Sequence, residues 1–515
     1  MPLELFKIVV TSDLHAQLAF DPKAHRPGLA RLGAYVFNLR KAGPVYLLDA
    51  GDLVSGSIYG AMDQGQTVAA LFGRLGYAAW LPGNHDFDYA PETGDPRQYF
   101  NTLCPLARNF SPDLKIAALN LTYQGQVLEG SNAPLILSLD PLVAVLGVSC
   151  PLTHRPSLGP ILGDFDFGLK ESLRATKENL LSLLAAAIEP LPGGTIIVLS
   201  HLGAAARAYA GLSAQMDLDF PNAPTGPDLA GVKGVSLVVD GHSHEIVEPY
   251  RPRSGSGLYL NLGQGGESLA QVAVYADGSF NLKLVTFNDL KDLTPDPELE
   301  ALTTDLTVSL GLNDHLLTLP PTAKYGLEGL WETIIPFGQL TVAAMAQKAH
   351  SQIAFLNKGS LRAGLEGQVT VASLYEALPF NDDLLSGEIT GQVLEDFLRD
   401  RGRKGFKGFP LIHGLALWAY PEGDKVGLAG ITLASGEEIK PEKTYSLALS
   451  GQMTRLLTNP KANYAFKGTL VAAILDFIRQ KGAANNLEIK TAYPPYQLFS
   501  DQKTAYKAFA ARVKS

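Results

Sequence analysis

Cysteine is nearly absent from this chain: Cys104 and Cys150 are the only two among 515 residues. Two cysteines cannot build a disulfide framework or a zinc site made of thiolates alone. Nothing else in the sequence requires a bridge between them, so we expect two buried thiols. The small disulfide-rich proteins and the thiolate zinc proteins are thereby excluded.

Long hydrophobic runs and an excess of positive charge are missing as well. No apolar run approaches the roughly 20 residues that span a bilayer, so no membrane association is expected. Residues 1–7 have neither the basic nor the apolar region of a signal peptide. The sequence as written therefore predicts a cytoplasmic protein, or a periplasmic or extracellular one if a leader was removed. The net charge of −9 argues against a nucleic acid polymer as partner, but not against a small anion.

The chain is long enough for two domains, and its composition, with 46% hydrophobic and 18% charged residues, is that of a globular protein. Over roughly the first 290 residues, short apolar runs alternate with amphipathic stretches, which is the pattern of an α/β domain. The clearest predicted strands are Lys7–Thr11, Val45–Asp49, Thr195–Ser200 and Val235–Asp240, and the clearest predicted helices are Gly28–Lys41 and Lys170–Ile188.

A change of pattern near residue 293 predicts the boundary between the domains. Asp296-Pro297-Glu298 is typical of a helix start, and Pro320-Pro321 ends the segment. We therefore predict a catalytic domain at 1–292, a linker helix region at 293–324 and a smaller α/β domain at 325–515. Within the last domain, elements are expected at Thr390–Asp400, Leu415–Tyr420 and Thr469–Arg479.

Metal-ligating residues follow five of the apolar runs. A single Asp or His in such a place is more often a turn former or a satisfied side chain, so only the joint pattern is informative. Because ligands in open α/β sheets bind beyond the carboxyl ends of the strands, these five loops are expected to meet at one edge. The segments are Asp13-Leu14-His15, Gly51-Asp52, Gly83-Asn84-His85-Asp86, Ser200-His201 and Gly241-His242-Ser243-His244.

The donors in these loops are carboxylates, imidazoles and one amide oxygen. That mixture suits Mn, Zn, Fe or Co and does not choose among them. Six or seven ligands are too many for one tetrahedral zinc ion, but they suit two ions roughly 3.5–4 Å apart that share a bridging carboxylate. Two divalent metal ions are therefore the predicted cofactors.

The five motifs resemble those of the calcineurin-like metallophosphoesterases, and more closely the bacterial 5′-nucleotidase and UDP-sugar hydrolase branch. This resemblance implies a four-layer α/β/β/α sandwich for the first domain, followed by the linker helix and a smaller α/β substrate-binding domain. It also implies a ligand set in which Asp52 bridges two metals, the first held by Asp13, His15 and His244 and the second by Asn84, His201 and His242.

The same resemblance implies hydrolysis of a phosphate ester by a metal-bridging hydroxide. His85 matches the catalytic histidine of the family and would stabilise the pentacoordinate phosphorus and protonate the leaving group. Asp88 would orient His85 and favour its protonated form, although an aspartate at this spacing can also be a simple turn residue.

The second domain resembles the C-terminal domain of the nucleotidases only in part. Asn357 and Gly359 with Arg362 match its Asn-x-Gly-x-x-Arg segment, and Phe380 matches a base-stacking aromatic residue. Arg362 would clamp an anion, and Phe380 would stack on a base. The second stacking aromatic is missing, because residues 450–455 read Ser-Gly-Gln-Met-Thr-Arg, and residues 323–361 contain no Arg.

Three functions remain open on the sequence alone. The first is a 5′-nucleotidase-like enzyme, monomer or homodimer, that removes phosphate from nucleotides. The second is the same metal centre acting on a 2′,3′-cyclic nucleotide, a nucleotide sugar or a thiosulfohydrolase-like substrate. The third is a non-catalytic metal-binding or ligand-binding protein, which is disfavoured because it would not need His85 and Asp88.

Overall fold

The computed structural model of the chain forms two compact units, Met1–Thr307 and Val308–Ser515, and each is described by itself. Every helix in the described part of the chain is too short or too polar to span a membrane. The residues that the structure describes are 2–61, 63–88, 108–109, 111–123, 125–127, 133–150, 165–166, 173–205, 222–253, 255–319, 336–361, 364–378, 382–404, 410–423, 425–451, 453–457, 464–481 and 496–514.

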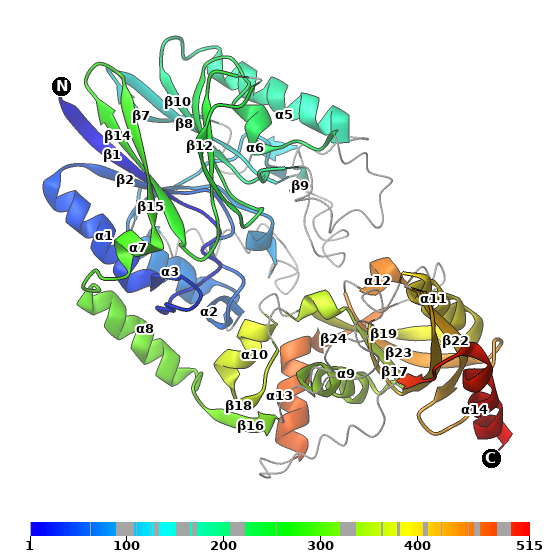
Figure 1. The fold of residues 1–515 in the computed structure, drawn as a ribbon. Coiled ribbons are helices and arrows are strands. Elements are labelled where there is room, and N and C mark those ends of the chain that lie inside the picture. Colours follow the sequence, from blue (N-terminus) through cyan, green and yellow to red (C-terminus); the bar gives the residue numbers. More distant parts are fainter. Residues whose placement is uncertain are drawn as a thin grey trace. The chain divides into compact units, whose positions relative to one another are not determined.

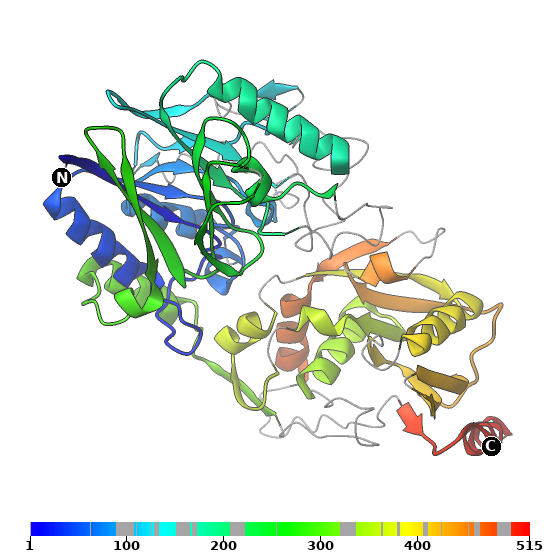
Figure 2. The same ribbon diagram turned by 45° about the horizontal axis from the view of Figure 1, so that its top comes forward.

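The N-terminal unit is built on two six-stranded sheets within the described residues (Figures 1 and 2). In the first sheet, β1, β2, β3 and β4 run parallel, whereas β14 and β15 join as an antiparallel pair. Its order is β15 (Phe280–Thr286), β14 (Ser268–Tyr275), β1 (Glu4–Thr11), β2 (Val45–Asp49), β3 (Tyr77–Trp80) and β4 (Lys115–Ile116).

The second sheet has a parallel centre and antiparallel edge strands. Its order is β12 (Ile246–Tyr250), β13 (Leu258–Leu262), β11 (Val235–Asp240), β10 (Thr195–Ser200), β8 (Leu142–Val148) and β7 (Leu135–Leu139). A small sheet, separate from these two, contains β6 (Gln126–Val127), β5 (Thr122–Tyr123) and β9 (Phe165–Asp166).

Helices cover the outer faces of both sheets, which gives the predicted four-layer α/β/β/α arrangement (Figure 1). On the second sheet, Leu180 and Leu184 of α5 pack against Val198 and Val238 in one apolar cluster. Burial of such side chains is the main term that holds the layers together. The helices of this unit are α1 (Gly28–Ala42), α2 (Ile58–Ala61), α3 (Gln66–Arg74), α5 (Leu173–Ile188), α6 (Gly226–Leu229), α7 (Phe287–Leu290) and the 3₁₀ turn η1 (His85–Phe87).

The predicted linker segment forms α8 (Pro297–Ser309). Asp296 precedes it, and its Oδ1 accepts a hydrogen bond from the N–H of Leu299 at 3.0 Å, as expected for a carboxylate at a helix start. The helix packs on the N-terminal unit, since Leu299 is buried beside Gly33 and the Tyr59 and Thr307 hydroxyls lie 2.8 Å apart.

The C-terminal unit contains a five-stranded mixed sheet within its described residues. Its order is β20 (Leu411–His413), β17 (Ile353–Leu356), β23 (Thr444–Ser450), β19 (Asp383–Thr390) and β24 (Ala465–Thr469), and a second sheet contains β22 (Lys425–Leu433), β21 (Leu415–Glu422) and β25 (Tyr496–Leu498). The remaining elements are β16 (His315–Leu319), β18 (Gly367–Thr370), α9 (Pro336–Ala349), η7 (Lys358–Ser360), α10 (Val371–Ala377), α11 (Gly391–Arg403), α12 (Met453–Leu456), α13 (Leu470–Lys481) and α14 (Gln502–Lys514).

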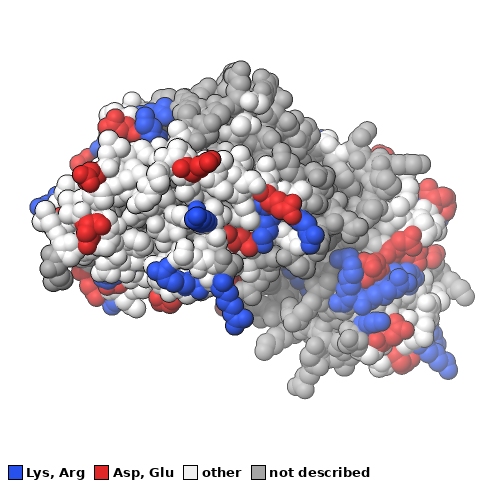
Figure 3. Space-filling model, turned by 90° about the horizontal axis from the view of Figure 1, so that it is seen from above, with Lys and Arg blue, Asp and Glu red and all other residues white. Residues whose placement is uncertain are grey.

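The surface carries charges of both signs. On the face drawn in Figure 3, the described Lys and Arg side chains are interspersed with Asp and Glu rather than gathered in one basic stripe.

Candidate metal centre

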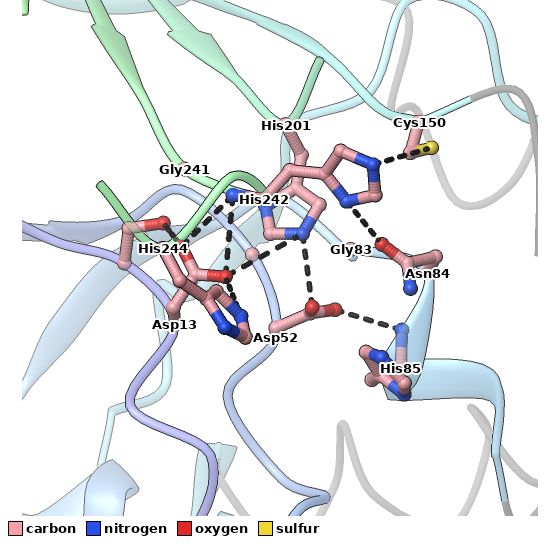
Figure 4. Close-up of polar contacts among 12 residues, drawn as sticks. Asp13, Asp52, Gly83, Asn84, His85, Cys150, His201, Gly241, His242 and His244 are labelled. Carbon is pink, nitrogen blue, oxygen red and sulfur yellow. Dashed lines mark hydrogen bonds and ion pairs between the residues drawn. The ribbon is translucent and has the colours of Figure 1, made fainter. Parts of the chain in front are cut away.

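The predicted ligands lie in loops that begin where buried strands end. β1 and β2 end two and three residues before Asp13 and Asp52, and β10 and β11 end directly before His201 and Gly241. β1 and β2 are parallel neighbours in one sheet, and β10 and β11 are parallel neighbours in the other, so within each sheet these loops leave from the same edge. Figure 4 shows the side chains of both sets pointing toward one another.

The backbone at these loops is unusual. Several of the predicted ligands have positive φ values, a region that residues other than glycine seldom occupy. Such a conformation costs about 1–3 kcal/mol and persists only where the surroundings enforce it, which is common at functional sites. The residues are Asp13 at 50°, His15 at 48°, Asp52 at 57°, His242 at 70° and His244 at 55°.

The first group of donors consists of Asp13, His15, Asp52 and His244. One ligand atom from each lies within 4.8 Å of all the others. The Nε2 atoms of His15 and His244 are 3.0 Å apart, and His244 Nε2 is 3.3 Å from Asp13 Oδ1. The first three residues are buried and His244 is partly exposed, so this group opens toward solvent on the side of His244.

The second group consists of Asn84, His201 and His242, together with Asp52. His201 Nε2 lies 3.0 Å from Asp52 Oδ2, and His242 Nδ1 lies 2.8 Å from Asn84 Oδ1. On its other side, His242 Nε2 is 4.0 Å from the sulfur of Cys150. Cys150 is buried, as predicted, whereas Cys104 lies outside the described residues. Asp52 is therefore the residue that the two groups share.

Backbone carbonyls determine which ring nitrogen of two histidines is available. His15 Nδ1 is 3.0 Å from the carbonyl oxygen of Ser55, and His201 Nδ1 is 2.7 Å from that of Ala50. A carbonyl oxygen only accepts hydrogen bonds, so each Nδ1 must carry the proton. When these rings are neutral, each Nε2 therefore presents a lone pair to the centre, as metal-ligating histidines do.

Two buried atoms of the donor set are suited to bind a cation. His201 Nε2 and Asp52 Oδ2 are both buried and 3.0 Å apart, yet neither has a hydrogen-bond partner in the described part of the chain. A lone pair and a carboxylate oxygen facing each other at that distance repel, so the pair needs a positive charge between them, either a proton on Nε2 or a metal ion.

The pKa shifts follow from burial and from the concentration of carboxylates. Burial lowers the pKa of His15 to about 4 and that of His242 to about 3, so both rings are neutral near pH 7. Burial alone would also lower the pKa of His201, but Asp52 and Asp13 outweigh it and raise that pKa to about 10. With no cation bound, a proton on His201 supplies the positive charge that the carboxylates attract.

His85 and Asp88 form a pair beside the donor groups. His85 Nδ1 is 2.8 Å from Asp88 Oδ2, which also accepts a hydrogen bond from the Ser55 hydroxyl at 3.0 Å. The ring of His85 lies edge-on to that of His15, with centroids 5.5 Å apart. The contact with Asp88 orients the ring of His85. Ser55 was not predicted from the sequence, because nothing in a lone serine shows that it will meet an aspartate 33 residues away.

Three glycines of the sequence motifs, Gly51, Gly83 and Gly241, pack against the predicted ligands. A Cβ atom on any of them would overlap a ligand side chain, so no other residue fits without displacing the centre. The added Cβ would lie 2.4 Å from His201 Nδ1 at Gly51, 2.3 Å from Asp52 Oδ1 at Gly83, and 2.2 Å from Asp13 Oδ2 at Gly241.

The predicted substrate-binding residues lie in the C-terminal unit. Asn357 follows β17 and caps the turn η7, where its side-chain oxygen accepts a hydrogen bond from the N–H of Gly359 at 3.4 Å. Both residues therefore shape this turn, whatever else they contact. Arg362 and Phe380 lie outside the described residues.

Two family models match the chain. Residues 6–245 match the calcineurin-like phosphoesterases, and residues 330–454 match the C-terminal domain of 5′-nucleotidases. The first range contains every predicted metal ligand together with His85 and Asp88, and the second contains Asn357, Gly359, Arg362 and Phe380. The two matches correspond to the two compact units.

Individual proteins agree with the family models. The chain is 23% identical to a trifunctional nucleotide phosphoesterase of Bacillus subtilis over 78% of its own length, although it spans only 29% of that longer protein. It is 24% identical to the 5′-nucleotidase of Bos taurus, with 76% of this chain and 71% of the relative covered. A solved structure of a putative 5′-nucleotidase from Staphylococcus aureus has the same fold, with a TM-score of 0.67, 16% identity, and 96% and 99% of the two chains covered. The chain thus combines a calcineurin-like metallophosphoesterase domain with a 5′-nucleotidase C-terminal domain.

Proposed function

We propose that this protein hydrolyses phosphate esters of nucleotides, as a 5′-nucleotidase does, with two divalent metal ions as cofactors. Asp13, His15 and His244 would hold one ion, and Asn84, His201 and His242 the other. Asp52 would belong to both sets. The donors suit Mn, Zn, Co or Fe, since they combine imidazole with carboxylate and amide oxygen.

The observation that carries this proposal is the contact between His201 and Asp52. Two buried groups that attract a positive charge face each other at 3.0 Å. Without a proton or a metal ion between them the two groups would be unsatisfied, and an unsatisfied buried polar group costs about 1–3 kcal/mol. A site built to bind cations accounts for the arrangement, since a metal ion can take the place of that proton.

The bound ions would neutralise the phosphate oxygens and lower the pKa of water near neutrality. The remaining contributions come from the chain. Because Asp88 orients the His85 ring, His85 can stabilise charge on the phosphoryl group and give a proton to the leaving oxygen. Burial of both residues excludes water from this proton path.

The nucleotide as substrate is supported by the relatives, which include 5′-nucleotidases and a nucleotide phosphoesterase. In the C-terminal unit, we propose that Arg362 binds the anionic part of the substrate and Phe380 stacks on the base. Asn357 and Gly359 would shape the turn η7, which precedes Arg362 in the chain. Loss of Arg362 should raise KM for AMP, because the variant loses a contact to the anionic part of the substrate.

The test is a substrate panel on the full chain, reconstituted with Mn²⁺ or Co²⁺. We expect hydrolysis of AMP to exceed that of UDP-glucose, a 2′,3′-cyclic nucleotide and bis-p-nitrophenyl phosphate. Asp52→Asn is the matched control, since it keeps the size of the side chain but removes the charge that both ions share, and it should abolish turnover. Preference for another ester would overturn the nucleotide assignment but leave the metal centre standing. Metal-loaded protein that turns over none of the esters would overturn the enzyme itself.

A further inference from the structure

Asp86 is a fully buried carboxylate that takes no part in the proposed ligand set or in the proton path. It nevertheless has the richest set of hydrogen bonds near the centre, and every one of them is an N–H donor. They come from the backbone of Asp52 at 2.9 Å, Leu53 at 2.8 Å, Val54 at 3.0 Å and Gly83 at 2.9 Å, and from the indole of Trp80 at 3.2 Å.

Three of the donors are successive backbone N–H groups, from residues 52–54. Consecutive N–H groups that point to one side form a concave site for an anion, and here the carboxylate of Asp86 is that anion. The turn includes Asp52 with its φ of 57°. Because this conformation is unfavourable for a residue with a side chain, the bonds to Asp86 compensate for it where the proposed bridging ligand leaves the sheet.

The same two loops are joined in the opposite direction. Asp52 Oδ1 accepts a hydrogen bond from the backbone N–H of His85 at 2.7 Å. Asp86 thus holds the backbone of Asp52, and Asp52 holds the backbone next to Asp86. One oxygen of Asp52 is committed to this contact, and the other, Oδ2, faces the donor groups.

We propose that Asp86 is a positioning residue that sets the distance between the two metal ions and the place of His85 beside them. By holding residues 52–54 against the segment Gly83–His85, it fixes the proposed bridging ligand relative to Asn84 and the proton donor. The inference rests on the proposed function, because it takes the assigned roles of Asp52, Asn84 and His85 as given.

Both acceptor oxygens of Asp86 are required as well as its shape. Five N–H donors need acceptor lone pairs, which an ionised carboxylate offers on both oxygens. An asparagine of the same size would turn its NH₂ group toward some of those donors and leave them unsatisfied. Asp86→Asn is therefore the informative variant. Asp86→Glu keeps the two acceptor oxygens and should retain part of the metal binding and kcat that Asp86→Asn loses.

The experiment compares wild type, Asp86→Asn and Asp86→Glu as full chains loaded with Mn²⁺. Metal per chain is measured by elemental analysis, the magnetic coupling of the Mn pair by electron paramagnetic resonance, and kcat and KM with AMP. The control is Leu184→Ala, a truncation in the apolar cluster under α5, which destabilises the same unit away from the loops.

We expect wild type to bind two ions with a coupled signal. Asp86→Asn should lose the coupled signal and 10- to 100-fold in metal affinity or kcat, the usual range for a group that orients ligands, while Asp86→Glu recovers part of the loss. Leu184→Ala should keep coupling and kcat at a comparable loss of thermal stability. If Asp86→Asn folds and retains a coupled pair with normal kcat, or if both variants lose only stability as Leu184→Ala does, the inference is wrong and the proposed function stands. A wild type that binds no pair of ions overturns both.

Discussion

His201 Nε2 and Asp52 Oδ2 lie 3.0 Å apart inside the N-terminal unit, although 149 positions of sequence separate the two residues. The pair sits where the loops of the two sheets meet. A proton and a metal ion compete for the same nitrogen there, because His201 Nδ1 is already committed to the carbonyl of Ala50. This competition makes the centre accessible to measurements that do not depend on turnover.

The first prediction concerns pH and stability without metal. The pKa of His201 is raised to about 10, so between pH 6.5 and 10 the folded protein binds more protons there than the unfolded chain. Its contribution to stability is complete below pH 6.5 and is lost as the pH rises through that window. Thermal unfolding in EDTA should therefore show Tm falling from pH 7 to pH 9. His201→Gln should remove the slope, and an unchanged slope in that variant would place its origin elsewhere.

Metal uptake should release protons over the same range. Binding through Nε2 displaces the proton from His201, whereas His15 and His242, with pKa values of about 4 and 3, have none to lose near pH 7. Calorimetric titration of the metal-free protein at pH 8, repeated in buffers of different ionisation enthalpy, should give at least about one proton per chain. Release of none would contradict the assignment of His201 as a ligand.

His85→Ala should separate catalysis from metal binding. The imidazole is paired with Asp88 rather than with the shared donors, so its loss should leave the metal content intact and lower kcat by on the order of 10²-fold or more. Elemental analysis and steady-state kinetics on the same sample test both halves. Near-normal turnover would show that another group supplies the proton.

Ser55→Ala tests whether the Ser55 hydroxyl supports the pair of His85 and Asp88. The variant removes a hydrogen bond to the Asp88 carboxylate, and bonds to charged groups contribute about 1.5–3 kcal/mol. We expect a several-fold fall in kcat with normal metal content. Ser57→Ala is the matched control, because its hydroxyl bonds to the carbonyl of Ala16 and not to Asp88. Equal kcat losses in the two variants would mean that general loosening of the loop is responsible.

Gly51→Ala should disrupt the metal centre itself. Gly51 has a φ of 108°, and a Cβ there would lie 2.4 Å from His201 Nδ1. Gly193 is the matched control, since it has a φ of 73° but nothing within 4 Å of an added Cβ. Gly193→Ala should cost only the roughly 1–2 kcal/mol of the left-handed backbone. Gly51→Ala should cost more and also lose metal, as measured by chemical unfolding and elemental analysis, and equal effects would show that crowding at His201 is unimportant.

Local pattern determined much of this protein in advance. Val45–Asp49, Thr195–Ser200 and Val235–Asp240 are strands with the predicted bounds, because a buried parallel strand is a short run of β-branched and other apolar residues. The helices begin and end within a few residues of prediction for the same reason, since amphipathic spacing is a local property. The residues of the candidate centre could also be predicted from the sequence, because the ligating side chains lie in the loops that follow those strands.

Tertiary structure alone decided how those residues are held. The sequence does not show that the carbonyls of Ala50 and Ser55 accept hydrogen bonds from Nδ1 of His201 and His15. Nor does it show that Asp86 accepts hydrogen bonds from five N–H groups. The contact of His201 with Ala50 joins segments that are 151 positions apart, and it exists only after the two sheets have packed. Periodicity reports which face of an element is buried, but it carries no information about the atom that will lie opposite.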